Sequence, residues 1–383
     1  MEIIDITGAL GPTPAFLESE IGAENFSQEL RIQSNDPDAR LRWLVGANYS
    51  ETEDASAQVI AIGTPDNVVA EVVNSDQLGE ADNAAVFASV ELTLTERFGV
   101  TVGGRYSSDD FEIVAPSGTL FPGSSNEFTP SVTLTFKPDN NSLLYATVSK
   151  GYRPGGVDTT FLDDDPNDAL TSEYDPETAW NYEIGANATL FDGLLIGRAA
   201  LFYMNYEDIQ EVFFVPPLNL STITTNGAEA EIFGAEFDVR LLVSENLSFN
   251  VNLGLLDSEY TDFDDSPSGD LTGNELPFAP RVNFSATGEY RWPVRGDMNA
   301  YVRVEYVYRS DQEGRNNNNP TELQPAYDLL HLRAGATFGN FELELYGENI
   351  LDEEYFTNRR PGPIVTVVPG RPAIWGIRGT ARF

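Results

Sequence analysis

The chain contains a single histidine, His331, and no cysteine, so few of its side chains could perform covalent chemistry. A lone histidine could serve as a general base in a catalytic triad, but no G-x-S-x-G motif supplies a nucleophile for it. The composition excludes cysteine nucleophiles, disulfides, thiolate metal sites and two-histidine metal sites. Because His331 alternates with apolar neighbours and shares its polar face with Arg333, we interpret it as a strand residue on the polar, lumen-facing side. We expect no catalytic residue, and therefore no enzyme.

Carboxylates are the remaining candidates for metal binding, and they are concentrated in two segments. Residues 157–177 contain eight acidic and no basic side chains. Asp163, Asp165 and Asn167 have the opening spacing of a calcium-binding loop, but the sixth position lacks glycine and Tyr174 occupies the twelfth. We therefore interpret this segment as a solvated acidic loop, and we expect neither a metal site nor a cofactor. Residues 260–275 form a second acidic segment, and two such segments on one side would favour cations over anions.

Isolated arginines in long polar segments are candidates for binding an anionic ligand, because a guanidinium can hold a carboxylate or similar group with two hydrogen bonds. The four candidates are Arg153, Arg315, Arg359 and Arg360. The alternative is that each pairs with acidic residues of its own loop, an arrangement common on protein surfaces.

The overall charge restricts the class of partner. The 383 residues include 61 Asp and Glu but only 22 Lys and Arg, which gives a formal net charge of −39. Such a chain repels phosphate, so we expect no nucleic-acid partner. The chain also has 23 Phe, 16 Tyr and 4 Trp, whereas disordered acidic segments have few aromatic residues. The composition therefore indicates an acidic chain that folds.

The elements that would position these residues are strands, because apolar and polar residues alternate along most of the chain. From Met298, for example, Ala300, Val302 and Val304 oppose Arg303 and Glu305. The alternating segments are longer than ordinary soluble strands and match the roughly 9–11 tilted residues that cross a bilayer. No run of about 18 apolar residues is present, which excludes a helical membrane protein.

Short and long connections also alternate along the chain. The short ones are residues 35–40, 95–98, 137–142, 191–193, 243–246, 292–297 and 339–340, and the long ones include residues 51–82, 153–172, 260–276, 311–324 and 352–370. Short periplasmic turns and long extracellular loops are typical of outer-membrane β-barrels. We therefore predict an all-β transmembrane antiparallel barrel with about 15 strands, the first at residues 26–34.

Several motifs resemble the C-terminal barrel of TonB-dependent receptors, the active transporters of the outer membrane. They are FSQELRIQS (residues 26–34), LRWLVGANY (41–49), SKGYRPGG (149–156), YDPETAWNYEIG (174–185), ELYGENILDEEY (344–355) and WGIRGTARF (375–383). The resemblance implies that the terminal strand, with Trp375, Ile377 and Phe383 on one face, is the signal read by the outer-membrane assembly machinery. It also implies a barrel of 22 strands with a plug domain.

We expect residues 1–25 to be the remnant of an extracellular loop and residues 26–383 to be the C-terminal part of the barrel. An odd strand count, the missing plug and the missing export signal predict a piece of a longer protein. The resemblance further implies uptake of a scarce nutrient such as a ferric siderophore, a TonB-type energy-coupling protein as partner, and contact with the lipid bilayer and lipopolysaccharide. A passive porin, a secreted acidic all-β binding protein and an outer-membrane hydrolase are the alternatives.

Overall fold

The computed structural model describes residues 2–5, 15–64, 67–114, 120–160, 170–214, 222–264, 266, 268–360 and 366–382. Within these ranges the chain is almost entirely β-strand, and the one helical segment is the 3₁₀ turn η1 (Phe191–Gly193). Among the described residues, no helix has both the length and the apolar character needed to cross a membrane.

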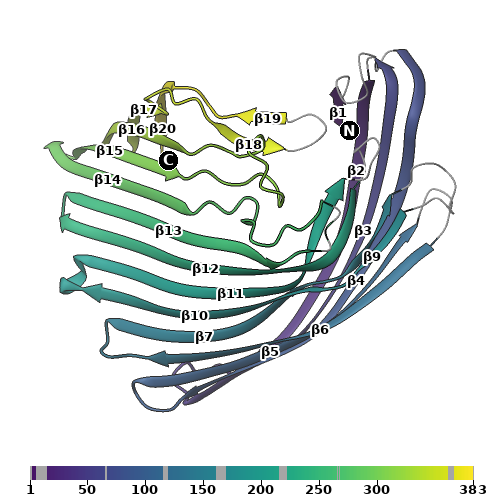
Figure 1. Ribbon diagram of the computed structural model, residues 1–383. Coiled ribbons are helices and arrows are strands. Elements are labelled where there is room, and N and C mark those ends of the chain that lie inside the picture. The colour runs from purple at the N-terminus through teal and green to yellow at the C-terminus, as the bar shows by residue number, and fades with distance from the viewer. Residues whose placement is uncertain are drawn as a thin grey trace.

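One antiparallel sheet of 16 strands makes up most of the described residues, and it curves through space as a broad wall (Figure 1). Across the sheet the strands are β1 (Glu2–Asp5), β2 (Ala15–Gln33), β3 (Leu41–Thr64), β4 (Asn67–Thr93), β5 (Phe98–Val114), β6 (Leu120–Phe136), β7 (Ser142–Arg153), β10 (Glu177–Leu190), β11 (Leu195–Phe214), β12 (Thr222–Ser244), β13 (Leu247–Asp262), β14 (Val282–Arg295), β15 (Met298–Arg309), β16 (Tyr327–Phe338), β17 (Phe341–Glu348) and β20 (Ile374–Ala381). Fifteen of them are long, which confirms the predicted strand count. The two edges, β1 and β20, are not paired with each other.

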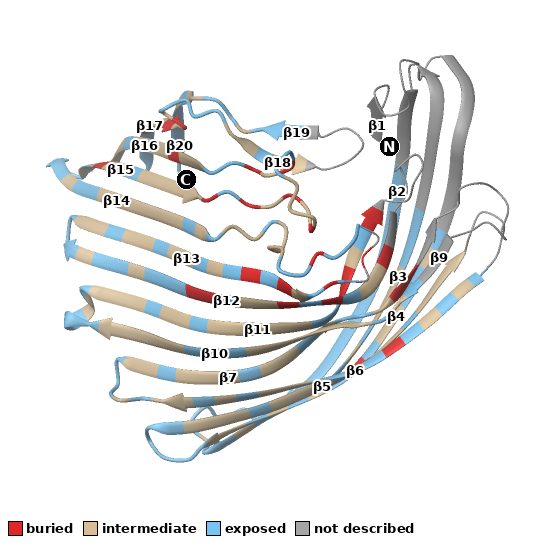
Figure 2. Ribbon diagram, in the orientation of Figure 1, coloured by how far each residue is buried: buried red, intermediate tan, exposed pale blue. Residues whose placement is uncertain are grey.

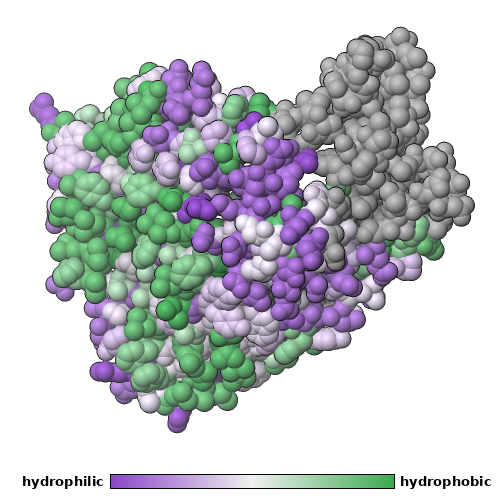
Figure 3. All heavy atoms as spheres, viewed as in Figure 1, coloured by the Kyte–Doolittle hydropathy of each residue, from purple (hydrophilic) through white to green (hydrophobic). Residues whose placement is uncertain are grey.

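The predicted alternation is visible in the exposure of the side chains. Large apolar residues of one face are open to the surroundings, among them Val102 (51%), Ile184 (57%) and Leu345 (57%). In a membrane barrel this apolar face contacts lipid, and the opposite polar face lines the lumen. Figure 3 shows the hydrophobic residues gathered on the half of the molecule that holds the short turns, with hydrophilic residues over the loop ends of the strands.

The short turns lie where the sequence predicted them, but the long connections are more regular than expected. The sequence predicts residues 51–82 as a loop, but residues 51–64 and 67–82 continue β3 and β4 as paired strands in which Glu51 lies opposite Asp82. Two other long connections contain small hairpins, β8 (Gly156–Thr160) with β9 (Leu170–Tyr174) and β18 (Phe356–Arg360) with β19 (Thr366–Pro369).

The first long strand also differs from the prediction. β2 begins at Ala15 rather than Phe26, and β1 pairs with its first residues. Residues 15–25 are therefore strand in conformation, as are the extended ends of β3 and β4. Their assignment to an extracellular loop stays a prediction, since a hairpin that rises above the membrane would also be part of such a loop.

Candidate functional site: the polar wall and its mouth

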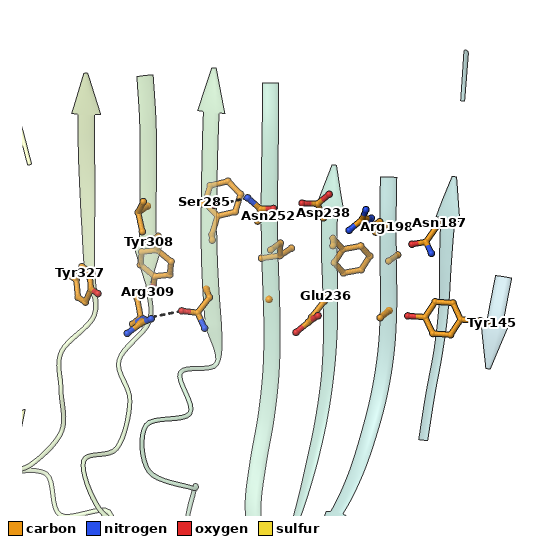
Figure 4. A pocket seen from close by; sticks show the side chains of 18 residues that line it. Tyr145, Asn187, Arg198, Glu236, Asp238, Asn252, Ser285, Tyr308, Arg309 and Tyr327 are labelled. Atoms are coloured by element: carbon orange, nitrogen blue, oxygen red, sulfur yellow. Dashed lines mark hydrogen bonds between the residues drawn. The ribbon is translucent and has the colours of Figure 1, made fainter. Parts of the chain in front are cut away.

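Two transverse rows of polar side chains cross the polar face of the sheet, because residues in register on neighbouring strands share a face. One row runs from Asn187 through Arg198, Asp238 and Asn252 to Ser285. Figure 4 shows these side chains on successive strands beside a cavity of about 570 Å³. Asn252 Nδ2 donates to Ser285 Oγ at 3.1 Å. The wall thus offers both charges and amides to whatever fills the lumen.

The next row lies one step nearer the loop ends, and it includes Glu236, Asn283, Arg309 and Tyr327. Arg309 Nε donates to Asn283 Oδ1 at 3.1 Å (Figure 4). One hydrogen bond on each row therefore joins side chains of neighbouring strands into a polar lining.

A second polar network covers β3–β7 and centres on Arg105. Its guanidinium donates to Asn48 Oδ1 at 3.0 Å, to Asn83 Oδ1 at 3.3 Å and to Ser107 Oγ at 2.9 Å. Asn83 Nδ2 in turn donates to Asp109 Oδ1 at 2.7 Å. Hydrogen bonds to a charged group are stronger than those between neutral groups, so this network fixes the guanidinium against the wall.

A third network lies near the short turns, where Tyr301 donates to Glu344 Oε2 at 2.7 Å and to Glu342 Oε1 at 3.1 Å. Arg378 and Arg382 of the terminal region approach the same two carboxylates at 3.2 Å and 3.4 Å. These contacts join β15, β17 and the terminal strand β20, so the last strand is tied to the wall by charge as well as by its backbone.

The mouth of the wall, at the loop ends of β11–β13, holds the principal cluster of buried apolar side chains. We call it the mouth cluster, and its buried members are Ile209, Phe213, Ala228, Ala230, Tyr260, Phe263 and Leu271. Figure 2 shows the buried residues of this region at the strand ends and in the adjoining loops. Residues 263–281, the first mouth loop, therefore fold onto the wall. Positions 265 and 267 of that loop lie outside the described residues.

Glu211 is the polar centre of the mouth. It accepts hydrogen bonds from the Tyr260 hydroxyl and from Asn316 Nδ2, the latter at 3.1 Å. Glu211 lies far along β11 from the short turn, beyond the roughly 11 residues that a bilayer covers. Burial raises the pKa of the Glu211 carboxyl, while the two hydrogen bonds oppose that rise. Burial also raises the pKa of Tyr260, which therefore stays a donor.

The asparagines at residues 316–319 belong to residues 310–326, the second mouth loop. Asn316 is 8% exposed and contacts Glu211, whereas Asn318 exchanges two hydrogen bonds with the backbone of Glu275. Asn319 Oδ1 accepts from both the amide and the hydroxyl of Thr321. Sequence reasoning missed the contacts to Glu211 and Glu275 because both partners are remote in the chain.

Three of the four candidate arginines can be placed with their side chains. Arg153 is exposed at the end of β7. Arg315 belongs to the second mouth loop, and its Nε lies 3.3 Å from Glu322 Oε2 of the same loop. Arg359 donates to the carbonyl of Leu323, which also lies in that loop. Arg360 ends β18, and its side chain lies outside the described residues. The structure thus brings Arg315 and Arg359 to one loop, and their role in binding a ligand stays a prediction.

Two of the three predicted assembly residues, Trp375 and Ile377, lie on the apolar face of β20. Trp375 is 62% exposed and Ile377 is 70% exposed, which suits contact with lipid. Phe383 lies outside the described residues. Recognition of this strand by the assembly machinery stays a prediction.

His331 has a structural environment on the polar face of β16, opposite Glu305. Its Nδ1 accepts a hydrogen bond of 3.2 Å from the backbone amide of Asn349, at the turn that follows β17. The contact agrees with the interpretation of His331 as a strand residue.

The two acidic segments differ in how much of them can be described. Residues 161–169, which include the calcium-like spacing, lie outside the described residues. The second segment forms most of the first mouth loop. Among the residues that the structure describes, no three His, Cys, Asp or Glu side chains are grouped so that they could hold a metal ion.

The chain is similar to known outer-membrane receptors. The family model "TonB dependent receptor-like, beta-barrel" matches residues 8–350. The probable TonB-dependent siderophore receptor PiuA of Acinetobacter baumannii is 24% identical over 310 residues, which are 77% of this chain and 40% of that protein.

Solved structures show the same fold. The ferric yersiniabactin uptake receptor FyuA from Yersinia pestis superposes with a TM-score of 0.79 at 20% identity, over 96% of this chain and 55% of that one. The siderophore receptor PiuA from Acinetobacter baumannii superposes with a TM-score of 0.73 at 19% identity, over 96% and 56%. The chain thus spans about half the length of these relatives. It belongs to the family of TonB-dependent receptor β-barrels, which are outer-membrane proteins.

Proposed function

We propose that this chain is the barrel part of a receptor that takes up a scarce nutrient, such as a ferric siderophore, across the outer membrane. The family match over residues 8–350 carries the proposal. The continuous polar lining from β3 to β20 supports it, because a large polar cargo needs a wide wet lumen to pass. Among the relatives named above, PiuA is described as a probable siderophore receptor and FyuA as a ferric yersiniabactin uptake receptor.

The energy for such uptake would come from a TonB-type protein that spans the periplasm, acting through a plug domain. Both belong to the proposal, since this chain spans about half of the receptors it resembles. The transport itself involves no covalent chemistry, and the relatives are receptors rather than enzymes. The half-buried His331, which accepts a hydrogen bond from the backbone amide of Asn349, also supports a role without hydrolysis.

The cargo would meet the extracellular mouth first. Arg153 is the candidate arginine most open to an arriving anionic chelate, whereas Arg315 and Arg359 would act through the second mouth loop. The apolar face would contact lipid and lipopolysaccharide, and β20 would be recognised during assembly. Family membership sets aside a secreted binding protein.

Uptake of iron-loaded chelates by cells tests this function. A strain lacking the full-length gene should lose accumulation of at least one radioactive ferric siderophore from a panel, and the gene on a plasmid should restore it. Dissipating the proton-motive force should abolish the same uptake. Accumulation that continues without the proton-motive force, together with leakage of small sugars, would instead indicate a passive porin.

A further inference from the structure

The second mouth loop and the strand end that leads into the first mouth loop use the same acceptor on the wall. Tyr260 is in turn bonded to the first mouth loop, because its backbone amide donates to the carbonyl of Asn274 and its carbonyl accepts from the amide of Gly273. Tyr260, just before the first mouth loop, and Asn316, in the second, donate to the two different carboxylate oxygens of Glu211. Asn316 and Glu211 are 105 positions apart in the chain, and Tyr260 and Glu211 are 49 apart. The side chain of Glu211 on β11 therefore contacts two segments that are both distant from it in the chain.

The two loops are also bonded directly to each other. Asn274 Nδ2 donates to the backbone carbonyl of Asn316 at 2.9 Å. The backbone amide of Glu275 donates to Asn318 Oδ1 at 2.7 Å, and Asn318 Nδ2 returns a bond to the carbonyl of Glu275 at 2.9 Å. Because the Asn316 side chain contacts the wall while its carbonyl contacts the other loop, the loop–loop and loop–wall contacts share one residue.

The donors that face Glu211 have little access to water. Tyr260 is 1% exposed and Asn316 is 8% exposed. A buried donor that loses its acceptor costs the full desolvation penalty, so removal of this carboxylate disfavours the docked arrangement of both loops together.

We propose that Glu211 is the positioning residue that fixes both mouth loops on the wall as one unit. The shape of this side of the mouth then depends on one carboxylate, and the loops dock or leave together. The inference goes beyond the proposed function, because it concerns the construction of the mouth whatever cargo enters. Its test needs no cargo, so the two proposals can fail independently.

Hydrogen exchange of the full-length receptor in detergent, followed by peptide mass spectrometry, tests the inference. Glu211→Ala should accelerate exchange at least tenfold in residues 268–281 and also in residues 311–326. The matched control is Glu207→Ala, on the same strand with an exposed side chain, which should change neither segment. Exchange in β16 should stay unchanged in both variants, which separates loop release from general destabilisation.

Asn316→Ala gives a second test that leaves the strand intact. It removes one donor from Glu211, yet exchange should again rise in both loops, because the loops are bonded to each other. A rise confined to residues 311–326 would overturn the single unit. For Glu211→Ala, a rise in only one loop, in neither loop, or equally in β16 would overturn the positioning role.

Discussion

The ring of Tyr145 on β7 lies over Gly185, its cross-strand partner on β10, and occupies the space that a Cβ at position 185 would need. The Tyr145 hydroxyl donates at 2.6 Å to Oε1 of Glu183, which lies two residues before Gly185 on β10. The ring is thereby held flat against the wall. The same pairing recurs on the polar face in Gly46–Phe87, Gly234–Phe202, Gly335–Tyr301 and Gly376–Tyr346. Flat aromatic rings cover bare backbone without reducing the width of the lumen.

Gly185→Ala should destabilise the barrel, because the new Cβ forces the Tyr145 ring off the wall and stretches its bond to Glu183. Overpacking of this kind costs about 1–3 kcal/mol. The free energy of unfolding, measured with urea after refolding into lipid vesicles, gives the cost.

Gly197→Ala on β11 is the matched control, since no atom lies within 4 Å of the Cβ position there. It should leave the midpoint unchanged or raise it slightly. Equal losses at positions 185 and 197 would show that the ring contact is unimportant and that glycine matters only through the backbone.

The sequence predicts the membrane-spanning half of this wall well, and the reason is physical. Where lipid lies on one side and water on the other, a strand must alternate strictly, as β15 does from Met298. Beyond the membrane both faces of a strand contact water, so apolar and polar residues need not alternate there. Residues 51–54 are all polar, and the continuation of β3 through them could not be recognised.

The candidate site was less predictable, because its contacts join distant segments. Nothing near Asn316 in the sequence indicates Glu211 as its partner. The arginines were chosen by charge and exposure, yet Arg315 faces Glu322, which lies in the same loop, and Arg359 faces a carbonyl. Charge type alone cannot distinguish an arginine that is available to a ligand from one that holds a loop in place.

Some of the acidic residues behind the net charge of −39 lie side by side in a way that the sequence did not reveal. On the apolar side of the extended hairpins, Glu24, Glu53, Glu80 and Glu112 lie directly opposite one another across four strands. Like charges in direct opposition destabilise a sheet. Glu53→Gln should therefore stabilise the hairpins by about a few tenths of a kcal/mol at low salt.

Thermal unfolding in detergent at two salt concentrations would measure this gain. Screening weakens repulsion between exposed charges, so the gain should shrink in about 0.5 M salt. Glu96→Gln, in the turn between β4 and β5, should show no gain at either concentration. A gain of equal size for Glu53→Gln at both concentrations would argue against repulsion as its origin.

We expect Asn349 to stabilise the fold of the segment that follows β17. It is 2% exposed, and its Nδ2 donates to the carbonyls of Glu353 and Arg371 at 2.9 Å and 3.0 Å. Its backbone has φ of 48°, a left-handed conformation that asparagine tolerates better than most residues. Asn349→Ala leaves both carbonyls without this donor and should cost about 1–3 kcal/mol.

The measurement is the fraction of receptor that reaches the heat-modifiable folded form in the outer membrane. His331→Ala removes only the acceptor for the Asn349 amide, so its loss should be smaller than that of Asn349→Ala. If His331→Ala had the larger effect, the histidine would have a role beyond this hydrogen bond.

Arg153→Ala should weaken uptake of an anionic ferric chelate, if the proposed function holds, by raising the concentration needed for half-maximal uptake. An exposed guanidinium attracts an anion during its approach and can bind it with two hydrogen bonds. The maximal rate should stay unchanged, because Arg153 lies at the rim and the energised step occurs in the lumen.

Arg153→Lys should restore part of the affinity, since lysine keeps the positive charge but cannot form the paired hydrogen bonds of a guanidinium. Arg309→Ala, on the polar wall, is the informative contrast, because a change there should alter the maximal rate instead. Unchanged concentration dependence in Arg153→Ala would remove this arginine from the ligand path.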